Sequence, residues 1–284
     1  MSEWPSTAED NAPTLAVGAL VAPGYRVLAH LRQGNELDVY DVWSEERQCR
    51  CVAKVLRLNR RDDSPARLRL LGEGRLLLGL AHPHIIRAYE LLPRPLPVLI
   101  VETLTGETLG HLIASRRQRL PVAELVCLGL HLCSALHYLH NRGVLHLDLK
   151  PSNVVSERGL AKLLDFSIAS APGRYRRGMG THLYMAPELA HGSPVSEATD
   201  VWGLGTVLYE AVTGQRPFPA RGNDQSIERQ PPGVRLSRRL PPAIASTIYG
   251  CLQPQPADRP RISDVTAVLR RQYAFLLPAI ASTS

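Results

Sequence analysis

Hydrophobic and polar residues alternate along the first third of the chain, which is the pattern of strands with one buried face. The alternation begins at Tyr25 and recurs as far as Val101, with turn-forming residues between the apolar runs. It predicts a small antiparallel sheet of five strands. The expected strands cover residues 25–31, 39–43, 49–56, 82–89 and 98–101.

Helical spacing replaces this alternation after residue 104. Leucine recurs every three or four residues between Pro121 and Asn141, and Gly143 then provides a helix stop. Two more helices are expected near 242–252 and 263–277, whereas residues 219–240 are rich in Pro, Arg and Gly and predict a loop. The chain is therefore expected to be an α+β protein, with one small sheet and a larger, mostly helical part.

Composition supports a folded chain with an irregular start. The 284 residues are 44% hydrophobic and 21% charged, a balance typical of a globular protein with a sizeable core. Residues 1–24 carry three prolines among small and acidic residues, and we expect them to form a disordered leader.

The chain is basic, with a formal net charge of +7. Its arginines are spread along the whole sequence and no base-reading motif accompanies them, so we expect a solvated basic surface and no nucleic-acid partner. Only three of the 33 basic residues are lysines, namely Lys54, Lys150 and Lys162. Arg does not imitate the compact ammonium of Lys at a phosphate-contacting position, so a surviving lysine suggests a specific role.

The cysteines and the apolar runs bear on the cellular compartment. Five cysteines form an odd set without a metal-ligand spacing, which predicts reduced thiols in a cytosolic protein. No apolar run approaches the roughly 18 residues of a membrane span, and no basic segment precedes the short apolar stretch 15–22. We therefore expect a cytoplasmic protein with no membrane partner.

The densest set of reactive groups is formed by Asp148, Lys150, Asn153 and Asp165. Asp148 could orient and deprotonate a hydroxyl group, and Lys150 could neutralise charge on a phosphoryl group during transfer. Asn153 and Asp165 offer the hard oxygen ligands that Mg²⁺ prefers. Phosphoryl transfer from a metal-bound nucleotide is the chemistry that calls for this combination.

The segment His146–Ser167 resembles the catalytic and metal-binding loops of protein kinases, whose signature is H-R-D-L-x-x-x-N followed by D-F-G. Leu147 stands in place of the Arg, and Ser167 in place of the Gly. The later run Gly180–Glu188 resembles the G-T-x-x-Y-M-A-P-E run of serine/threonine kinases. Over residues 25–277 the chain is similar to the eukaryotic-like serine/threonine protein kinases of bacteria.

The resemblance implies a bilobal fold and a reaction. The small lobe would cover residues 25–101, the hinge 102–104 and the large lobe 105–277, followed by a tail over 278–284. The implied reaction is transfer of a phosphoryl group from ATP to serine or threonine hydroxyls of a protein, with Mg²⁺ or Mn²⁺ as cofactor. Autophosphorylation would be one form of it.

The resemblance also assigns roles in the small lobe. Lys54 would hold the α- and β-phosphates and pair with Glu73. Residues 31–39 occupy the place of the G-x-G-x-x-G-x-V loop, but only Gly34 of its three glycines is kept, and Asp38 would add a negative charge near the phosphates. The residues implied around the adenine ring are Leu31, Val39, Val52, Glu102, Leu104 and Val155.

In the large lobe the resemblance implies three structural contacts. Thr181 would bridge Asp148 and Lys150, and Asp200 would hydrogen-bond the backbone of the catalytic loop. Glu188 would form a buried ion pair with Arg259. Leu147 stands where many kinases have an arginine that binds the phosphate of a phosphorylated activation segment. Because this charge is absent, activity is expected not to depend on phosphorylation of the activation segment.

Two readings of function stay open at this point. The first is an active serine/threonine protein kinase. The second is a nucleotide-binding pseudokinase that serves as a protein-interaction scaffold, which the altered glycine loop and Leu147 favour. The retained base position Asp148 argues against a scaffold, because a scaffold needs no base. A kinase of small molecules with a related fold is a minor third option.

Overall fold

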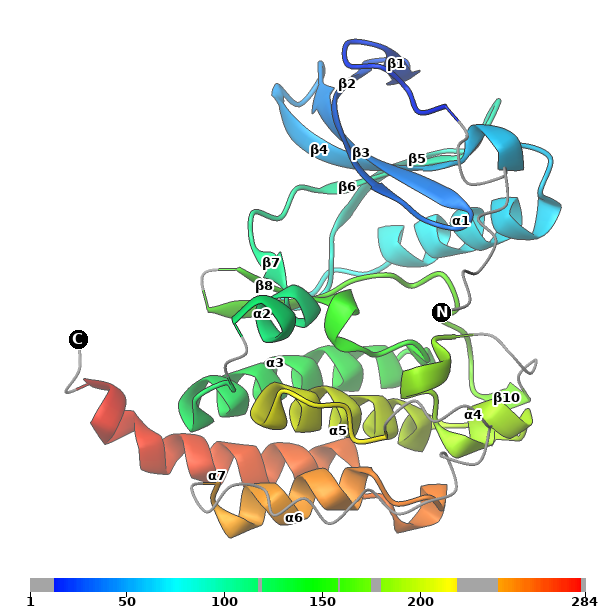
Figure 1. Cartoon of the computed structure of the whole chain (residues 1–284). Coiled ribbons are helices and arrows are strands. Elements are labelled where there is room, and N and C mark those ends of the chain that lie inside the picture. The colour runs from blue at the N-terminus through cyan, green and yellow to red at the C-terminus, as the bar shows by residue number, and fades with distance from the viewer. Residues whose placement is uncertain (1–12, 117–118, 158, 175–179, 219–239, 282–284) are drawn as a thin grey trace, which may run out of the picture. The chain divides into compact units, whose positions relative to one another are not determined.

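The computed structural model describes residues 13–281 apart from 117–118, 158, 175–179 and 219–239. The chain divides into two compact units (Figure 1). The sheet unit comprises Met1–Ala81 and Ile86–Thr103, and the helical unit comprises His82–Ile85 and Leu104–Ser284. This confirms the expected α+β fold with a sheet lobe and a helical lobe. Residues 219–239 of the expected loop lie outside the described residues.

The sheet unit is built on one antiparallel sheet in the order β1-β2-β3-β4-β6-β5. Its six strands include the five that the alternating pattern predicts, so the strand count differs by one. The bounds are β1 Leu20–Ala22, β2 Tyr25–Gln33, β3 Leu37–Ser44, β4 Cys49–Leu56, β5 Ala88–Leu92 and β6 Val98–Glu102.

The structure differs from the sequence-based expectation at both ends of this sheet. Strand β1 falls in the segment expected to be a disordered leader; Gly24, with φ of 79°, lets the chain reverse so that Ala22 pairs with Tyr25. Residues 1–12 of that leader lie outside the described residues. Strand β5 starts at Ala88 rather than at His82, because His82–Ile85 forms a turn that belongs to the helical unit.

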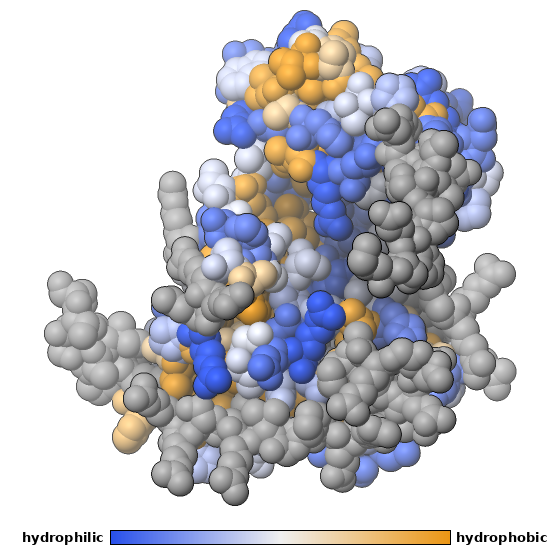
Figure 2. All heavy atoms as spheres, viewed as in Figure 1, coloured by the Kyte–Doolittle hydropathy of each residue, from blue (hydrophilic) through white to orange (hydrophobic). Residues whose placement is uncertain are grey.

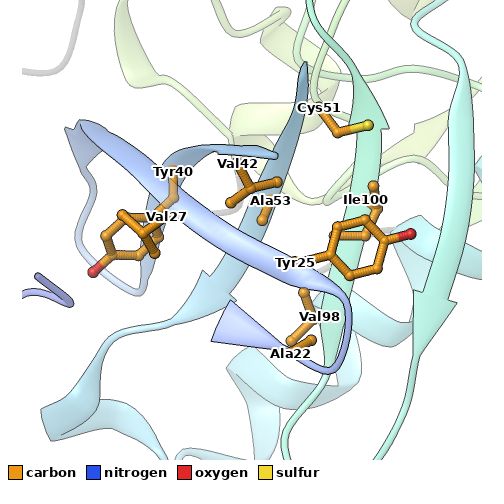
Figure 3. Packing of buried hydrophobic residues seen from close by; sticks show 9 residues of the cluster. All are labelled: Ala22, Tyr25, Val27, Tyr40, Val42, Cys51, Ala53, Val98 and Ile100. Atoms are coloured by element: carbon orange, nitrogen blue, oxygen red, sulfur yellow. The ribbon is translucent and has the colours of Figure 1, made fainter. Parts of the chain in front are cut away.

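One face of the sheet forms the core of this unit (Figure 3). Tyr40 and Val42 of β3 lie beside Cys51 and Ala53 of β4, and none of these four side chains is more than 1% exposed. The segment before β1 is tied to the same core, because the backbone N–H of Leu15 donates to the Tyr40 hydroxyl at 2.9 Å. Figure 2 shows hydrophobic residues at the surface of this unit near β1 and β2.

Helix α1 (Ser64–Leu78) packs on β5 and β6 of the sheet unit. Asp63 caps its first turn by accepting from the N–H of Ala66 at 2.9 Å. Gly74 lies where the helix meets β5: a Cβ there would come within 2.7 Å of a Leu91 methyl carbon. Gly74 lowers the intrinsic stability of the helix by about 1 kcal/mol relative to Ala, but it allows the helix to pack closely on the sheet.

The helical unit is organised around α5 (Glu197–Thr213), of whose seventeen residues thirteen are buried. Helix α3 (Val122–His140) packs against α5 and α7 (Ile262–Ala281). The other elements are α2 Leu109–Arg116, α4 Pro187–His191 and α6 Pro242–Cys251, the strands β7 Glu107–Thr108, β8 Val154–Glu157, β9 Leu160–Leu163, β10 Gly173–Arg174 and β11 Pro194–Val195, and short 3₁₀ turns at 151–153, 182–184 and 256–258.

Helix α3 is long and apolar enough to span a membrane by length and composition. A core helix meets the same criterion, and α3 has nine buried residues. At Gly129 a Cβ would lie 2.7 Å from a methyl carbon of Leu269 in α7, so the two helices pack tightly. Its apolar character is thus explained by its place in the core of the helical unit.

Two stacked histidines join three segments of the helical unit. The rings of His84 and His131 have centroids 4.1 Å apart. His84 Nδ1 lies 2.9 Å from the carbonyl oxygen of Ala161 in β9, and the N–H of Ala161 donates to His131 Nδ1 at 3.3 Å. Burial lowers the pKa of His131 to about 4, and burial also lowers the pKa of His84.

Acidification is expected to destabilise the helical unit through this stack. An unfolded histidine has a pKa of about 6.5, so between that value and about pH 4 the unfolded chain binds a proton that folded His131 does not. The free energy of unfolding is therefore highest above about pH 6.5 and decreases as the pH falls from about 6.5 towards about 4. His131→Gln should reduce that loss by on the order of 1 kcal/mol, since the ring is only partly buried.

The measurement is the free energy of unfolding in urea at about pH 7.5 and about pH 5. His137→Gln is the matched control, because His137 lies on the same helix with an exposed ring bonded to Asn141. A pH dependence that is the same in wild type and His131→Gln would contradict this assignment.

Candidate active site

The loop over residues 146–153, which the resemblance implies is catalytic, is anchored by the start of α5. The Asp200 carboxylate, 1% exposed, accepts from the N–H of His146 at 2.9 Å and from the N–H of Leu147 at 2.8 Å. His140 Nε2 lies 2.9 Å from the same carboxylate. The contact expected of Asp200 is confirmed. Gly203 in α5 lies close to the loop, because a Cβ there would come within 2.8 Å of Leu149 Cβ.

A second set of contacts brings Asp165 beside this loop. His146 Nε2 lies 3.0 Å from the carbonyl oxygen of Leu164, and the N–H of Leu164 donates to the carbonyl oxygen of Asn153 at 2.8 Å. Phe166 packs edge-on against the His146 ring, with centroids 4.8 Å apart. The two expected metal ligands, Asn153 and Asp165, are therefore held on adjacent segments of one unit.

The two departures from the kinase signature have different structural consequences. Leu147 has a φ of 66°, a left-handed conformation that costs a non-glycine residue about 1–2 kcal/mol, and its side chain is 6% exposed. Asp165 also has a positive φ, of 58°, whereas Ser167 does not. Ser167 is thus tolerated in place of glycine, and its N–H donates to Asp165 Oδ1 at 3.3 Å.

Asp148 is the centre of a polar network. Its Oδ2 accepts from the Lys150 ammonium at 2.5 Å and from the Asn153 amide at 3.0 Å, and its Oδ1 accepts from the N–H of Thr181 at 3.1 Å. Lys150 also donates to the Thr181 hydroxyl. The expected bridge by Thr181 is confirmed. The network fixes the orientation of a carboxylate that is 9% exposed.

The sheet unit carries the other expected group of site residues. The Lys54 ammonium lies 2.6 Å from Glu73 Oε1, so the expected pair is present; the Glu73 side chain is buried. Val39 stands opposite Lys54 in the β3–β4 register, and Val52 stands opposite Asp41. Val39, Val52 and Lys54 therefore share one face of the sheet.

The remaining expected adenine-site residues are divided between the units. Leu31 of β2 is 53% exposed, and Glu102 ends β6, where its Oε1 accepts from the N–H of Arg87 at 2.8 Å. Leu104 and Val155 belong to the helical unit, and Val155 is 5% exposed. That these residues surround one adenine ring stays a prediction.

The expectation for Asp38 is wrong. Its side chain is 2% exposed and lies 3.0 Å from His30 Nε2, on the opposite face of β3 from Val39. Side chains alternate along a strand, and the buried position of Tyr40 fixes which face Asp38 shares. Asp38 therefore does not add charge to the face that carries Lys54.

A second anchor of the helical unit is the expected pair of Glu188 and Arg259, which is confirmed. The guanidinium contacts both carboxylate oxygens, at 2.7 and 2.8 Å, and the Arg259 side chain is fully buried. Arg259 also donates to the carbonyl oxygens of Ala198, Gln253 and Pro254.

Two contacts were not expected from the sequence. His140, the last residue of α3, has its Nε2 2.9 Å from the carboxylate of Asp200, and no motif in the sequence links these two residues. Glu36, at the tip of the altered glycine loop, pairs with Arg69 of α1. These two residues are 33 positions apart, and no pattern in the sequence links them.

Comparison with known proteins agrees with this geometry. Residues 25–273 match the family model of the protein kinase domain. The serine/threonine-protein kinase PkaA of Streptomyces coelicolor is 34% identical over 231 residues, which are 76% of this chain and 42% of that protein. The DNA damage-responsive serine/threonine-protein kinase RqkA of Deinococcus radiodurans is 30% identical, covering 87% of this chain and 39% of that protein.

A third relative, the serine/threonine-protein kinase pkn3 of Myxococcus xanthus, is 32% identical over 86% of this chain and 49% of its own length. The chain thus spans less than half the length of each of these three curated relatives. The family model covers nearly the whole chain in one stretch. This chain belongs to the protein kinase domain family.

Proposed function

We propose that the chain catalyses ATP-dependent phosphorylation of serine and threonine hydroxyls in a protein substrate. The observation that carries the proposal is the network in which Lys150, Asn153 and Thr181 hold the Asp148 carboxylate. A hydroxyl placed against this carboxylate would be oriented and would pass its proton to it as the oxygen attacks the γ-phosphorus and the bond from that phosphorus to the leaving ADP breaks. Lys150, bonded to the same carboxylate, would offset negative charge on the phosphoryl group.

Asn153 and Asp165 are the proposed ligands of a divalent cation. The Asn153 amide nitrogen is bonded to the Asp148 backbone and side chain, which leaves its amide oxygen to face a cation. Among the described residues no group of three or more His, Cys, Asp or Glu side chains could hold a metal. The two oxygen donors of Asn153 and Asp165 fit Mg²⁺, which binds few protein oxygens and completes its coordination shell with water and phosphate. Bound there, the ion would neutralise phosphate charge.

In the sheet unit we assign the α- and β-phosphates to Lys54. A 2.6 Å contact with the buried Glu73 carboxylate fixes the direction of its ammonium. The apolar side chains of Val39 and Val52, on the same face, would contact the adenine ring, and the end of β6 would offer it backbone hydrogen-bonding groups. A charged group for the phosphates, an apolar face for the base and backbone groups for its polar edge are what binding of a nucleoside triphosphate requires.

Two observations favour a serine/threonine kinase over the alternatives. The intact Asp148 network favours an enzyme over a scaffold, because a scaffold gains nothing from an oriented base. The Lys150–Thr181 hydrogen bond joins the catalytic loop to the run that resembles serine/threonine kinases.

We also propose a cytoplasmic location, where ATP is abundant and where the five free cysteines would stay reduced.

Incubation with γ-³²P-labelled ATP, Mg²⁺ and a casein substrate tests the proposal. Labelled phosphoserine or phosphothreonine is expected from the wild type, and Lys54→Met should lower the rate by about 100-fold, because one charged group on the phosphates is lost. Arg270→Met is the control, since Arg270 is an exposed residue of α7 and is not among the proposed site residues. Absence of label with the wild type, or equal label with Lys54→Met, would contradict the proposed function.

A further inference from the structure

The altered glycine loop is held by its own unit. The turn between β2 and β3 closes with a bond from the N–H of Gly34 to the carbonyl oxygen of Leu37, at 2.8 Å. Arg57, directly after β4, binds both sides of this turn: its N–H donates to the carbonyl oxygen of Glu36 at 2.9 Å, and its guanidinium donates to the carbonyl oxygen of Gly34 at 3.3 Å. Arg57 is 4% exposed, so this attachment is buried.

The side chain at the tip of the turn is tied to helix α1. The Glu36 carboxylate receives two donors from the Arg69 guanidinium: Nε at 3.1 Å from Oε2, and Nη2 on Oε1. A two-pronged contact between Arg and a carboxylate is stronger and more directional than a single one. The pair is about two-thirds shielded from solvent, with side-chain exposures of 37% for Glu36 and 29% for Arg69.

Arg69 and Glu73 lie one helical turn apart on the same side of α1. Glu73 binds Lys54 in the middle of the sheet, and Arg69 binds the tip of the loop. Helix α1 is therefore joined to the sheet by two ion pairs, so a displacement of the helix that breaks one of them would strain the other.

We propose that Arg69 is a positioning residue for nucleotide binding, which holds the glycine-poor loop through Glu36 and keeps the Glu36 carboxylate neutralised. The inference rests on the proposed function, because the loop covers phosphates only if the chain binds ATP. Flexible glycines at the positions of Arg32 and Leu37 would let the backbone close on the phosphates. This chain holds the loop with side-chain contacts instead.

The charge of Glu36 gives the proposal a distinctive signature. Without Arg69, a carboxylate at the tip of the loop would face the negative charge of the triphosphate and weaken ATP binding. Arg69→Gln is therefore expected to raise KM for ATP about fivefold, with kcat changed less than about twofold. Glu36→Gln removes the unfavourable charge, so the double variant Glu36→Gln/Arg69→Gln should return KM to that of Glu36→Gln alone.

Arg67→Gln is the matched control. Arg67 lies on the same helix two positions away and donates to the carbonyl oxygens of Pro93 and Pro95, away from the loop. Its KM for ATP should equal that of the wild type. A KM of Arg69→Gln that equals that of Arg67→Gln, or that Glu36→Gln fails to rescue, would overturn the proposal.

Amide hydrogen exchange without nucleotide separates this inference from the proposed function. Peptides spanning residues 33–38 are expected to exchange about fivefold faster in Arg69→Gln and in Glu36→Gln than in wild type or Arg67→Gln. If the wild type transfers no phosphate, the proposed function fails, and exchange still decides whether Arg69 holds the loop. Unchanged exchange in Arg69→Gln would refute that role whatever the activity.

Discussion

Asp148→Asn is expected to lower kcat for phosphoryl transfer by about 10³-fold while the Kd for ATP changes little. The amide is nearly the same size as the carboxylate, but it has a single acceptor oxygen. It can therefore keep the hydrogen bond from Lys150 or the one from the N–H of Thr181, and the rest of the loop stays in place. It cannot accept the proton of the attacking hydroxyl. A base acts only as the bond to phosphorus forms, and its loss therefore leaves ground-state binding of ATP in place.

The measurement pairs single-turnover kinetics with calorimetric titration of ATP. Asp264→Asn is the control, because Asp264 is an exposed carboxylate that accepts from the N–H of Arg261 at the start of α7. The control should keep the wild-type kcat. Activity of Asp148→Asn within about threefold of wild type would remove Asp148 from the role of base.

Glu188→Gln is expected to lower the free energy of unfolding of the helical unit by about 3–5 kcal/mol. The substitution removes one charge of a buried pair and leaves the Arg259 guanidinium, whose side chain is fully buried, without its counter-charge. The guanidinium also lies 5.0 Å from the Trp202 ring of α5, so the disturbance reaches the central helix. Backbone carbonyls that accept from Arg259 offset only part of the loss.

Urea unfolding followed by far-UV circular dichroism measures this loss. Glu124→Gln serves as control, because it makes the same substitution at an exposed position in the first turn of α3. It should cost no more than a few tenths of a kcal/mol. A cost below about 1 kcal/mol for Glu188→Gln would show that the pair is replaceable by hydrogen bonds alone.

The regular parts of the fold could be predicted because their patterns are local. Alternation along β3 and β4 and leucine spacing along α3 follow directly from which faces are buried. Strand β1 was missed because three residues are too few to show a period, and its partner β2 supplies most of the order. The start of β5 was placed too early because His82–Ile85 belongs to another unit than the strand that follows.

The residues of the candidate site also fall into those that a local pattern predicts and those that it does not. Asp148, Lys150, Asn153 and Asp165 could be found because they lie close in sequence and carry complementary chemistry. The Glu188–Arg259 pair spans 71 positions and could be expected only from the resemblance to kinases.

Contacts outside the family signature were not predictable. The Glu36–Arg69 pair depends on how α1 lies on the sheet, and a residue pattern does not state that. The direction of the Asp38 side chain could not be predicted for a related reason. Side chains of adjacent residues in a strand point to opposite faces of the sheet, but only the buried packing of Tyr40 shows which face Asp38 shares.

A structure of the chain with a non-hydrolysable ATP analogue and Mg²⁺ tests the central claim most directly. We expect the Lys54 ammonium on the α- and β-phosphates, the oxygens of Asn153 and Asp165 on the metal, and the Asp148 carboxylate facing the γ-phosphate. A complex in which Lys54 and Asp165 contact different molecules, or in which the nucleotide binds away from both, would contradict the account.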